Sequence, residues 1–182
     1  MALVTPVIFQ VVGYQNSGKT TITTKLINLL TENGVKTVTI KHHGHGGRPD
    51  YLPLKDTEKH IKAGAIASIV EGDGSLLLQA ENHYYSLEDQ IELMKFFQPD
   101  VILIEGYKLE AFPKLLLLRD ENDFSLLKSV SNIAAIVYWK EKMEKVIKLK
   151  TNIPCFHIDD KRAITWTFKL LQELVQKIDQ NS

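Results

Sequence analysis

The residues between Gly13 and Thr20 have the types and the spacing of a phosphate-binding loop. Gly13 and Gly18 allow the backbone to turn tightly and to come close to an anion. Successive N–H groups of the loop and the positive end of a following helix can then surround phosphate oxygens. Lys19 can reach the β and γ phosphates, and the Thr20 hydroxyl is placed to bind Mg²⁺. The candidate nucleotide-binding residues here are Gly13, Gln15, Asn16, Ser17, Gly18, Lys19, Thr20 and Thr21.

The segments on both sides of this loop supply the context that it needs. Residues 7–12 are mostly β-branched or aromatic, which indicates a buried parallel strand. Residues 20–33 place apolar side chains on one helical face, and Gly34 follows where a helix would end. A short β-branched strand over residues 35–40 would complete a right-handed β-α-β unit.

Two carboxylates could serve the metal ion of such a site. Residues 101–104 form a wholly apolar run that ends in Glu105, as expected when a buried strand delivers an acid to its carboxyl end. Many phosphate-loop enzymes have Asp there, so Glu105 would hold Mg²⁺ directly or through water. Asp56 begins a short predicted helix over residues 56–63 and could approach the Mg²⁺, although a simple capping role is the alternative. We take Lys19, Glu105 and Asp56 as candidate catalytic residues, and Thr20 and Glu105 as candidate metal ligands.

The segment from Lys41 to Asp50 follows the second predicted strand and should emerge at the same edge as the phosphate loop. Three interpretations of it remain open. His42, His43 and His45 could bind a metal, the loop could contact an anionic ligand, or it could be a solvated loop. Lys41 and His42 are candidate ligand contacts.

The rest of the chain is consistent with one α/β domain over residues 1–182. Apolar runs around a Gly-rich turn at residues 71–74 predict a β-hairpin, and Ser86 with Asp89 has the capping-box pattern. Buried strands are predicted at 115–118, 133–138 and 155–158, and an amphipathic helix spans 164–178. Cys155 and His157 are interpreted as a buried thiol and a hydrogen-bonded histidine. The expected fold is a P-loop NTPase, a three-layer α/β/α arrangement with a mostly parallel sheet and an inserted β-hairpin.

The composition restricts the classes of partner. The 182 residues carry a formal net charge of zero with scattered basic residues, so a nucleotide is expected rather than a nucleic acid polymer. A single cysteine cannot form an internal disulfide, the N-terminus does not resemble a signal peptide, and no apolar run approaches about 20 residues. We expect a cytoplasmic protein without a membrane span.

The chain resembles the molybdopterin-guanine dinucleotide biosynthesis protein B (MobB) family. The resemblance rests on the phosphate loop and on matches that follow in the family's order at residues 41–43, 56–57, 62–65, 104–108 and 113–114. It implies a GTP-binding protein with weak GTPase activity that uses Mg²⁺. It also implies a homodimer that assists a MobA-type guanylyltransferase in joining GMP to the molybdenum cofactor, with molybdopterin as a further ligand.

The residues alone do not select guanine over adenine, because no Asn-Lys-x-Asp run follows a later strand. Two alternatives to the MobB function remain open. One is a metallochaperone-type GTPase for nickel enzyme maturation, with the histidine-rich loop as its metal store. The other is a small-molecule kinase or ATP-dependent ligase.

Overall fold

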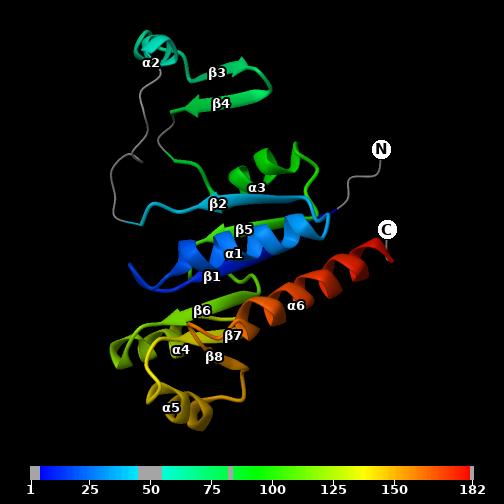
Figure 1. Ribbon diagram of the computed structural model, residues 1–182. Helices are drawn as coiled ribbons and strands as arrows, with labels where there is room; N and C mark the ends of the chain where they lie inside the picture. The colour runs from blue at the N-terminus through cyan, green and yellow to red at the C-terminus, as the bar shows by residue number, and fades with distance from the viewer. Residues whose placement is uncertain (1–4, 45–54, 82–83, 181–182) are drawn as a thin grey trace. The chain divides into compact units, whose positions relative to one another are not determined.

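The computed structural model describes residues 5–44, 55–81 and 84–180 (Figure 1). The chain falls into two compact units, one made of residues 1–44 and 91–182 and the other of residues 45–90. The expectation of a single nucleotide-binding domain over residues 1–182 stays a prediction. Among the helices of the described segments, none is long and apolar enough to cross a membrane.

The first unit is built around a six-stranded sheet in which each pair of neighbouring strands runs parallel. The strand order is β2-β5-β1-β6-β7-β8, so the first strand is central. In this register Glu105 of β5 is paired with Val11 of β1 on one side and with Lys41 of β2 on the other. The bounds are β1 Val7–Val12, β2 Thr37–Lys41, β5 Val101–Glu105, β6 Lys114–Leu118, β7 Ile133–Tyr138 and β8 Cys155–His157.

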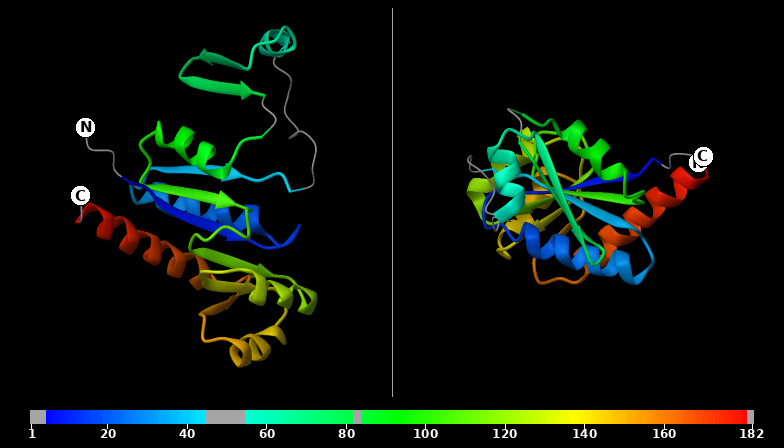
Figure 2. Two further views of the ribbon diagram at one scale, coloured as in Figure 1. Left: turned by 180° about the vertical axis from the view of Figure 1, so that it is seen from behind. Right: turned by 90° about the horizontal axis from the view of Figure 1, so that it is seen from above.

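Helices cover both faces of the sheet because alternate strand residues point to opposite sides. Phe9 and Val11 of β1 pack in one apolar cluster with α1 (Lys19–Glu32) and α6 (Arg162–Asp179), which lie side by side (Figure 2). Val12 packs in the other cluster with the 3-10 helix η1 (Glu121–Ser125), α4 (Leu126–Ser129) and α5 (Met143–Lys150). The predicted three-layer α/β/α class with a mostly parallel sheet is therefore confirmed.

The second unit contains α2 (Lys55–Lys62), the strands β3 (Ala67–Gly72) and β4 (Ser75–Ala80), and the start of α3 (Leu87–Lys95). β3 and β4 form an antiparallel hairpin whose turn residues, Asp73 and Gly74, have φ angles of 51° and 76°. Positive φ at both turn residues is the arrangement that matches the twist of a two-residue hairpin. The predicted inserted hairpin is confirmed.

The predicted capping box at the start of α3 is also present. The Ser86 N–H donates to Asp89 Oδ2 at 3.0 Å, and the Asp89 N–H donates to Ser86 Oγ at 3.0 Å. These bonds lower the pKa of Asp89 because they stabilise its ionised form. By contrast, η1, α4 and α5 have no counterpart among the predicted elements. They are short, and the burial of Leu126, Met143 and Ile147 against the sheet stabilises them more than their own sequence does.

Candidate phosphate-binding site

The loop between β1 and α1 has the backbone conformation of an anion-binding turn. Gly13, Asn16 and Gly18 have φ angles of 155°, 56° and 91°, in the region that favours glycine or asparagine. Gly18 is the N-cap of α1 and makes no side-chain capping hydrogen bond, and the first turn of α1 carries no acidic residue. The N–H groups of that turn and the helix dipole therefore remain available to an external anion.

Three of the predicted site residues meet at the end of this loop. The Thr20 hydroxyl donates to Glu105 Oε1 at 2.9 Å, although the two residues are 85 positions apart in the chain. Glu105 is buried at the tip of β5. The Lys19 ammonium donates to the carbonyl of Tyr14, in its own loop, at 2.7 Å. A cation, a hydroxyl and a carboxylate are thus held beside one helix N-terminus.

Charges near the loop act on Lys19 in both directions. Partial burial lowers its pKa most, because the charged form loses hydration. Glu105 raises the pKa of Lys19 by attraction, while Lys41 and Lys108 lower it by repulsion. The several positive groups close to Lys19 make this end of the sheet electropositive, as phosphate binding requires.

The end of β2 also reaches this edge, as predicted for Lys41 and for His42, which follows it. Lys41 Nζ lies 3.3 Å from Glu105 Oε1 and donates to Thr20 Oγ1 at 3.3 Å. The His42 N–H donates to the carbonyl of Glu105 at 2.9 Å, and its ring packs against Tyr107 with 4.4 Å between centroids. The predicted His45 and the residues up to Asp50 lie outside the described residues.

The other predicted residues occupy different surroundings. Ser17 is the buried residue of the loop, and Thr21 is exposed in the first turn of α1. Asp56 belongs to the second unit, where its carboxylate forms an ion pair with Lys59 at 3.0 Å. A role for Asp56 at the metal ion stays a prediction.

Two side chains that were not predicted hold the loop from the far side. The Trp139 indole N–H donates to the carbonyl of Ser17 at 2.9 Å, and Arg119 Nη1 donates to the carbonyl of Gln15 at 3.3 Å. Trp139 follows β7 directly and Arg119 follows β6 directly. Their position after parallel strands was the available signal, since ligand sites form at the carboxyl ends of such strands.

The segment after Glu105 is fixed by buried polar side chains. Gln10, which is fully buried in β1, donates through Nε2 to the carbonyls of Gly106 at 3.1 Å and Tyr107 at 2.7 Å. The buried Lys114 donates to the carbonyl of Glu110, and its pKa is lowered by burial. Tyr107 itself has a φ of 51°, which costs energy for a non-glycine residue. Gln10 thus stabilises the turn that carries Glu105 and Tyr107.

Replacing Gln10 by leucine is expected to lower the free energy of unfolding by about 2 kcal/mol, because two partly buried carbonyls lose their donor. Urea denaturation measures the change. Gln176→Leu, at an exposed position of α6, is the matched control and should stay within about 0.5 kcal/mol of the original chain. Equal stability of the two variants would show that the Gln10 bonds contribute nothing.

Cys155 and His157 have structural surroundings. His157 Nε2 lies 2.9 Å from the carbonyl of Trp139, and its Nδ1 accepts from the Asp159 N–H at 3.3 Å. Burial raises the pKa of the Cys155 thiol. Among the described residues, no group of three or more His, Cys, Asp or Glu side chains is arranged to hold a metal ion.

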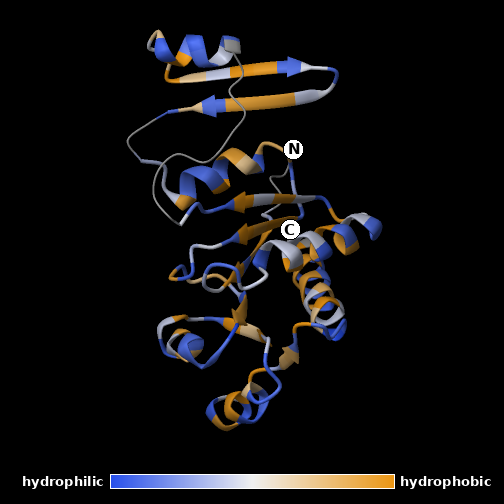
Figure 3. Cartoon of the chain, turned by 60° about the vertical axis from the view of Figure 1, so that its left-hand side comes forward, coloured by the Kyte–Doolittle hydropathy of each residue, from blue (hydrophilic) through white to orange (hydrophobic). Residues whose placement is uncertain are grey.

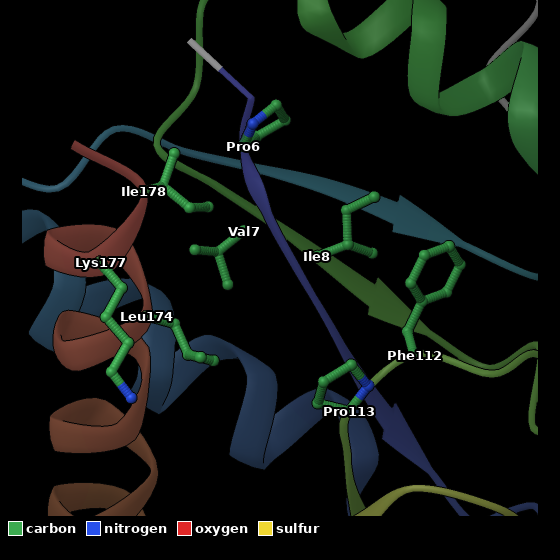
Figure 4. Close-up of a pocket in the computed structure, with 8 residues that line it drawn as sticks. All are labelled: Pro6, Val7, Ile8, Phe112, Pro113, Leu174, Lys177 and Ile178. Carbon is green, nitrogen blue, oxygen red and sulfur yellow. The ribbon is translucent and has the colours of Figure 1, made fainter. Parts of the chain in front are cut away.

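A groove of about 380 Å³ lies at the opposite end of β1 (Figure 4). Its lining is almost entirely apolar and is contributed by the start of β1, the segment before β6 and the end of α6. Pro6 and Val7 are at this end, whereas the phosphate loop follows Val12. The groove is therefore separate from the phosphate site.

The family model and the curated relatives point to one family. The model for "Molybdopterin guanine dinucleotide synthesis protein B" (MobB) matches residues 8–139. A Bacillus subtilis (strain 168) protein, the "Probable molybdopterin-guanine dinucleotide biosynthesis adapter protein", is 41% identical over 174 residues, covering 94% of this chain and 98% of the relative. The Escherichia coli (strain K12) "Molybdopterin-guanine dinucleotide biosynthesis adapter protein" is 34% identical over 114 residues, covering 59% of this chain and 63% of the relative.

Solved structures show the corresponding fold. The crystal structure of Bacillus subtilis MobB is similar at a TM-score of 0.77 with 38% identity, covering 90% of this chain and 96% of that one. A MobB homologue from Bacillus stearothermophilus gives a TM-score of 0.73 with 32% identity, covering 91% of this chain and 98% of that one. The similarity to each of these structures covers about nine-tenths of this chain.

Proposed function

The chain belongs to the molybdopterin guanine dinucleotide synthesis protein B (MobB) family, and we propose that it is an adapter that binds Mg²⁺ and GTP at the phosphate loop. In this proposal Lys19 and the loop amides bind the β and γ phosphates, while Thr20 and Glu105 hold the Mg²⁺. Gly13, Gln15, Asn16, Ser17, Gly18 and Thr21 shape the cradle, and Lys41 and His42 face the ligand from the next strand. The adapter assists a MobA-type guanylyltransferase in forming molybdopterin guanine dinucleotide, with molybdopterin as a further ligand.

The observation that carries the proposal is the 2.9 Å hydrogen bond between Thr20 Oγ1 and Glu105 Oε1 beside Lys19. A hydroxyl and a carboxylate are the hard oxygen ligands that Mg²⁺ prefers. Ser17 Oγ is buried without a hydrogen-bond partner in the described structure, which fits a loop built to surround a polar ligand. When bound, Mg²⁺ would neutralise charge on the phosphates.

We expect the accompanying GTP hydrolysis to be slow. Glu105 Oε1 already accepts a hydrogen bond from Thr20 and forms an ion pair with Lys41, so this oxygen is occupied and is not placed to take a proton from an attacking water. The residues that bind phosphate and metal are therefore better arranged to hold a nucleotide than to turn it over. This is the behaviour that an adapter needs.

Calorimetric titration with GTP and with ATP, each with and without Mg²⁺, tests the proposed ligand. We expect binding of GTP that depends on Mg²⁺ and is at least about tenfold tighter than binding of ATP, which corresponds to about 1.4 kcal/mol. The titration is then repeated with molybdopterin and with the guanylyltransferase present. If neither GTP nor ATP binds, the proposal is overturned. If the two nucleotides bind with equal affinity, the choice of guanine is overturned.

The family match favours the adapter over the metallochaperone and over the kinase or ligase. Within the described residues the His42 ring packs against Tyr107 instead of joining a metal cluster. Titration with Ni²⁺ tests the metallochaperone function. That function requires stoichiometric Ni²⁺ binding that disappears when the loop histidines are replaced. ATP turnover stimulated by a carboxylic or hydroxylic substrate would support the kinase or ligase.

We also propose that the chain acts as a homodimer, and the β3–β4 hairpin supports this. Five of its apolar side chains are exposed; they are Ile69, Val70, Leu76, Leu77 and Leu78. Successive residues of a strand point to opposite faces, so these side chains occupy both faces of the hairpin. Figure 3 shows hydrophobic colouring along both strands. A two-stranded hairpin cannot bury both of its own faces, and isolated hairpins are at best marginally stable. Contact with a second copy would remove this apolar surface from water.

Replacing Leu77 by aspartate is expected to weaken the dimer by about 100-fold, because each copy loses a leucine that the dimer would bury and gains a charge there. Sedimentation equilibrium measures the dissociation constant. Leu149→Asp is the matched control, since Leu149 is 87% exposed on α5. A monomeric original chain, or a Leu77→Asp dimer as tight as the control, would contradict this assignment.

A further inference from the structure

Lys41 places a positive charge against the same two oxygens that the proposed metal site uses. Its Nζ lies 3.3 Å from Glu105 Oε1 and 3.3 Å from Thr20 Oγ1. Lys41 and Glu105 are directly paired in the register of β2 and β5, so the ammonium comes from the neighbouring strand tip. The fold therefore supplies this contact through the sheet itself, and not through a flexible segment.

The hydrogen bonds also orient the Thr20 hydroxyl. Its only proton is donated to Glu105 Oε1, so its oxygen lone pairs are left to face a cation. The Lys41 ammonium takes one of these lone pairs. A hydroxyl in this orientation suits Mg²⁺ equally well, because a metal ion also binds through the lone pair.

An ammonium and Mg²⁺ cannot share these oxygens at low cost. Mg²⁺ binds at about 2.1 Å and demands near-ideal geometry, which brings it within a few ångströms of Lys41 Nζ. Repulsion between like charges at about 4 Å is large wherever water screens them incompletely. The Lys41 side chain is 62% exposed, whereas that of Glu105 is 10% exposed, so the lysine can leave and the carboxylate cannot.

Resting on the proposed nucleotide function, we propose that Lys41 is a tethered competitor of the divalent cation. Its ammonium neutralises Glu105 and occupies the Thr20–Glu105 oxygen pair, and an entering cation must displace it. Lys41 thereby sets the cation concentration at which the site fills.

The test is a titration with Mn²⁺, followed by electron paramagnetic resonance of the free ion, at saturating non-hydrolysable GTP analogue and low salt. Because the analogue in solution also binds Mn²⁺, the same titration without protein is subtracted for each variant. Lys41→Met should tighten the apparent dissociation constant for Mn²⁺ by about fivefold, the value of one partly exposed ion pair. Lys41→Arg keeps the charge and should remain within about twofold of the original chain. Raising the salt concentration should shrink the Lys41→Met effect, because salt screens exposed pairs.

Two control variants distinguish the direct contact of Lys41 with Thr20 and Glu105 from the general effect of removing a positive charge. Lys108→Met removes a charge that also acts on Lys19, but the Lys108 ammonium lies over the Tyr14 ring at 4.7 Å from its centroid. Lys36→Met removes an exposed charge just before β2 begins. Both should change Mn²⁺ affinity clearly less than Lys41→Met.

Mn²⁺ affinity that is unchanged or weaker in Lys41→Met, or an equal gain in Lys108→Met, would overturn the competition. In that case normal GTP binding by the original chain would leave the proposed function standing. If the original chain binds neither Mn²⁺ nor nucleotide, both the competition and the proposed function fail.

Discussion

Lys19→Ala is expected to weaken nucleoside triphosphate binding by at least about 100-fold, because charge-assisted hydrogen bonds to phosphate are each worth about 1.5–3 kcal/mol. The fold should remain intact, since the Lys19 ammonium is bonded to the carbonyl of Tyr14 in its own loop and not to the apolar core. Calorimetry with GTP and Mg²⁺ measures the affinity, and urea denaturation measures the stability.

Lys25→Ala provides the matched control for this prediction. Lys25 lies on the same helix, α1, and is exposed. Its replacement removes the same charge one to two turns further along, so GTP affinity should change by less than about threefold. A folded Lys19→Ala variant with the original affinity would show that the loop is not the phosphate site.

Gly13→Ala is expected to disrupt the loop itself. A Cβ on Gly13 would lie 2.6 Å from Ser17 Oγ and 2.7 Å from the carbonyl oxygen of Leu117, and the residue has a φ of +155°. Leu117 is fully buried in β6, so its carbonyl cannot move away. Overpacking and backbone strain each cost about 1–3 kcal/mol, and we expect a combined loss of stability of about 3–5 kcal/mol. The displaced loop should also lose nucleotide binding.

Gly34→Ala separates overpacking from backbone strain as causes of the lost stability. Gly34 has a φ of +74° at the end of α1, but a Cβ there would meet no atom within 4 Å. Only the conformational penalty of about 1–2 kcal/mol should appear, with unchanged GTP affinity. Thermal unfolding and calorimetry are measured on both variants. A Gly13→Ala variant as stable as Gly34→Ala would mean that the loop tolerates the additional carbon.

Local patterns in the sequence were sufficient for much of the fold. The hairpin turn follows from Asp73 and Gly74, which tolerate positive φ, and the capping box follows from Ser86 and Asp89. The apolar run before Glu105 predicted a buried strand with an acid at its tip. Each of these signals acts between residues that are close in the chain, so their meaning does not depend on the rest of the fold.

The partners of these elements were decided only by the tertiary structure. Glu105 reaches Thr20 because β5 lies beside β1, and it reaches Lys41 because β2 lies on its other side. Spacing along the chain does not specify which parallel strands become neighbours, since crossover connections can pass over intervening strands. For the same reason, spacing along the chain does not predict the hydrogen bond from Trp139 to the phosphate loop, although its position directly after β7 places Trp139 at the same edge of the sheet.

The sequence by itself determined a phosphate loop between a strand and a helix, with a carboxylate at another strand tip and an inserted hairpin. The tertiary structure decided that this carboxylate would be shared between Thr20 and Lys41. The physical reason is that backbone turns and helix starts depend on neighbouring residues, whereas ion pairs depend on which strand ends the sheet brings within a few ångströms.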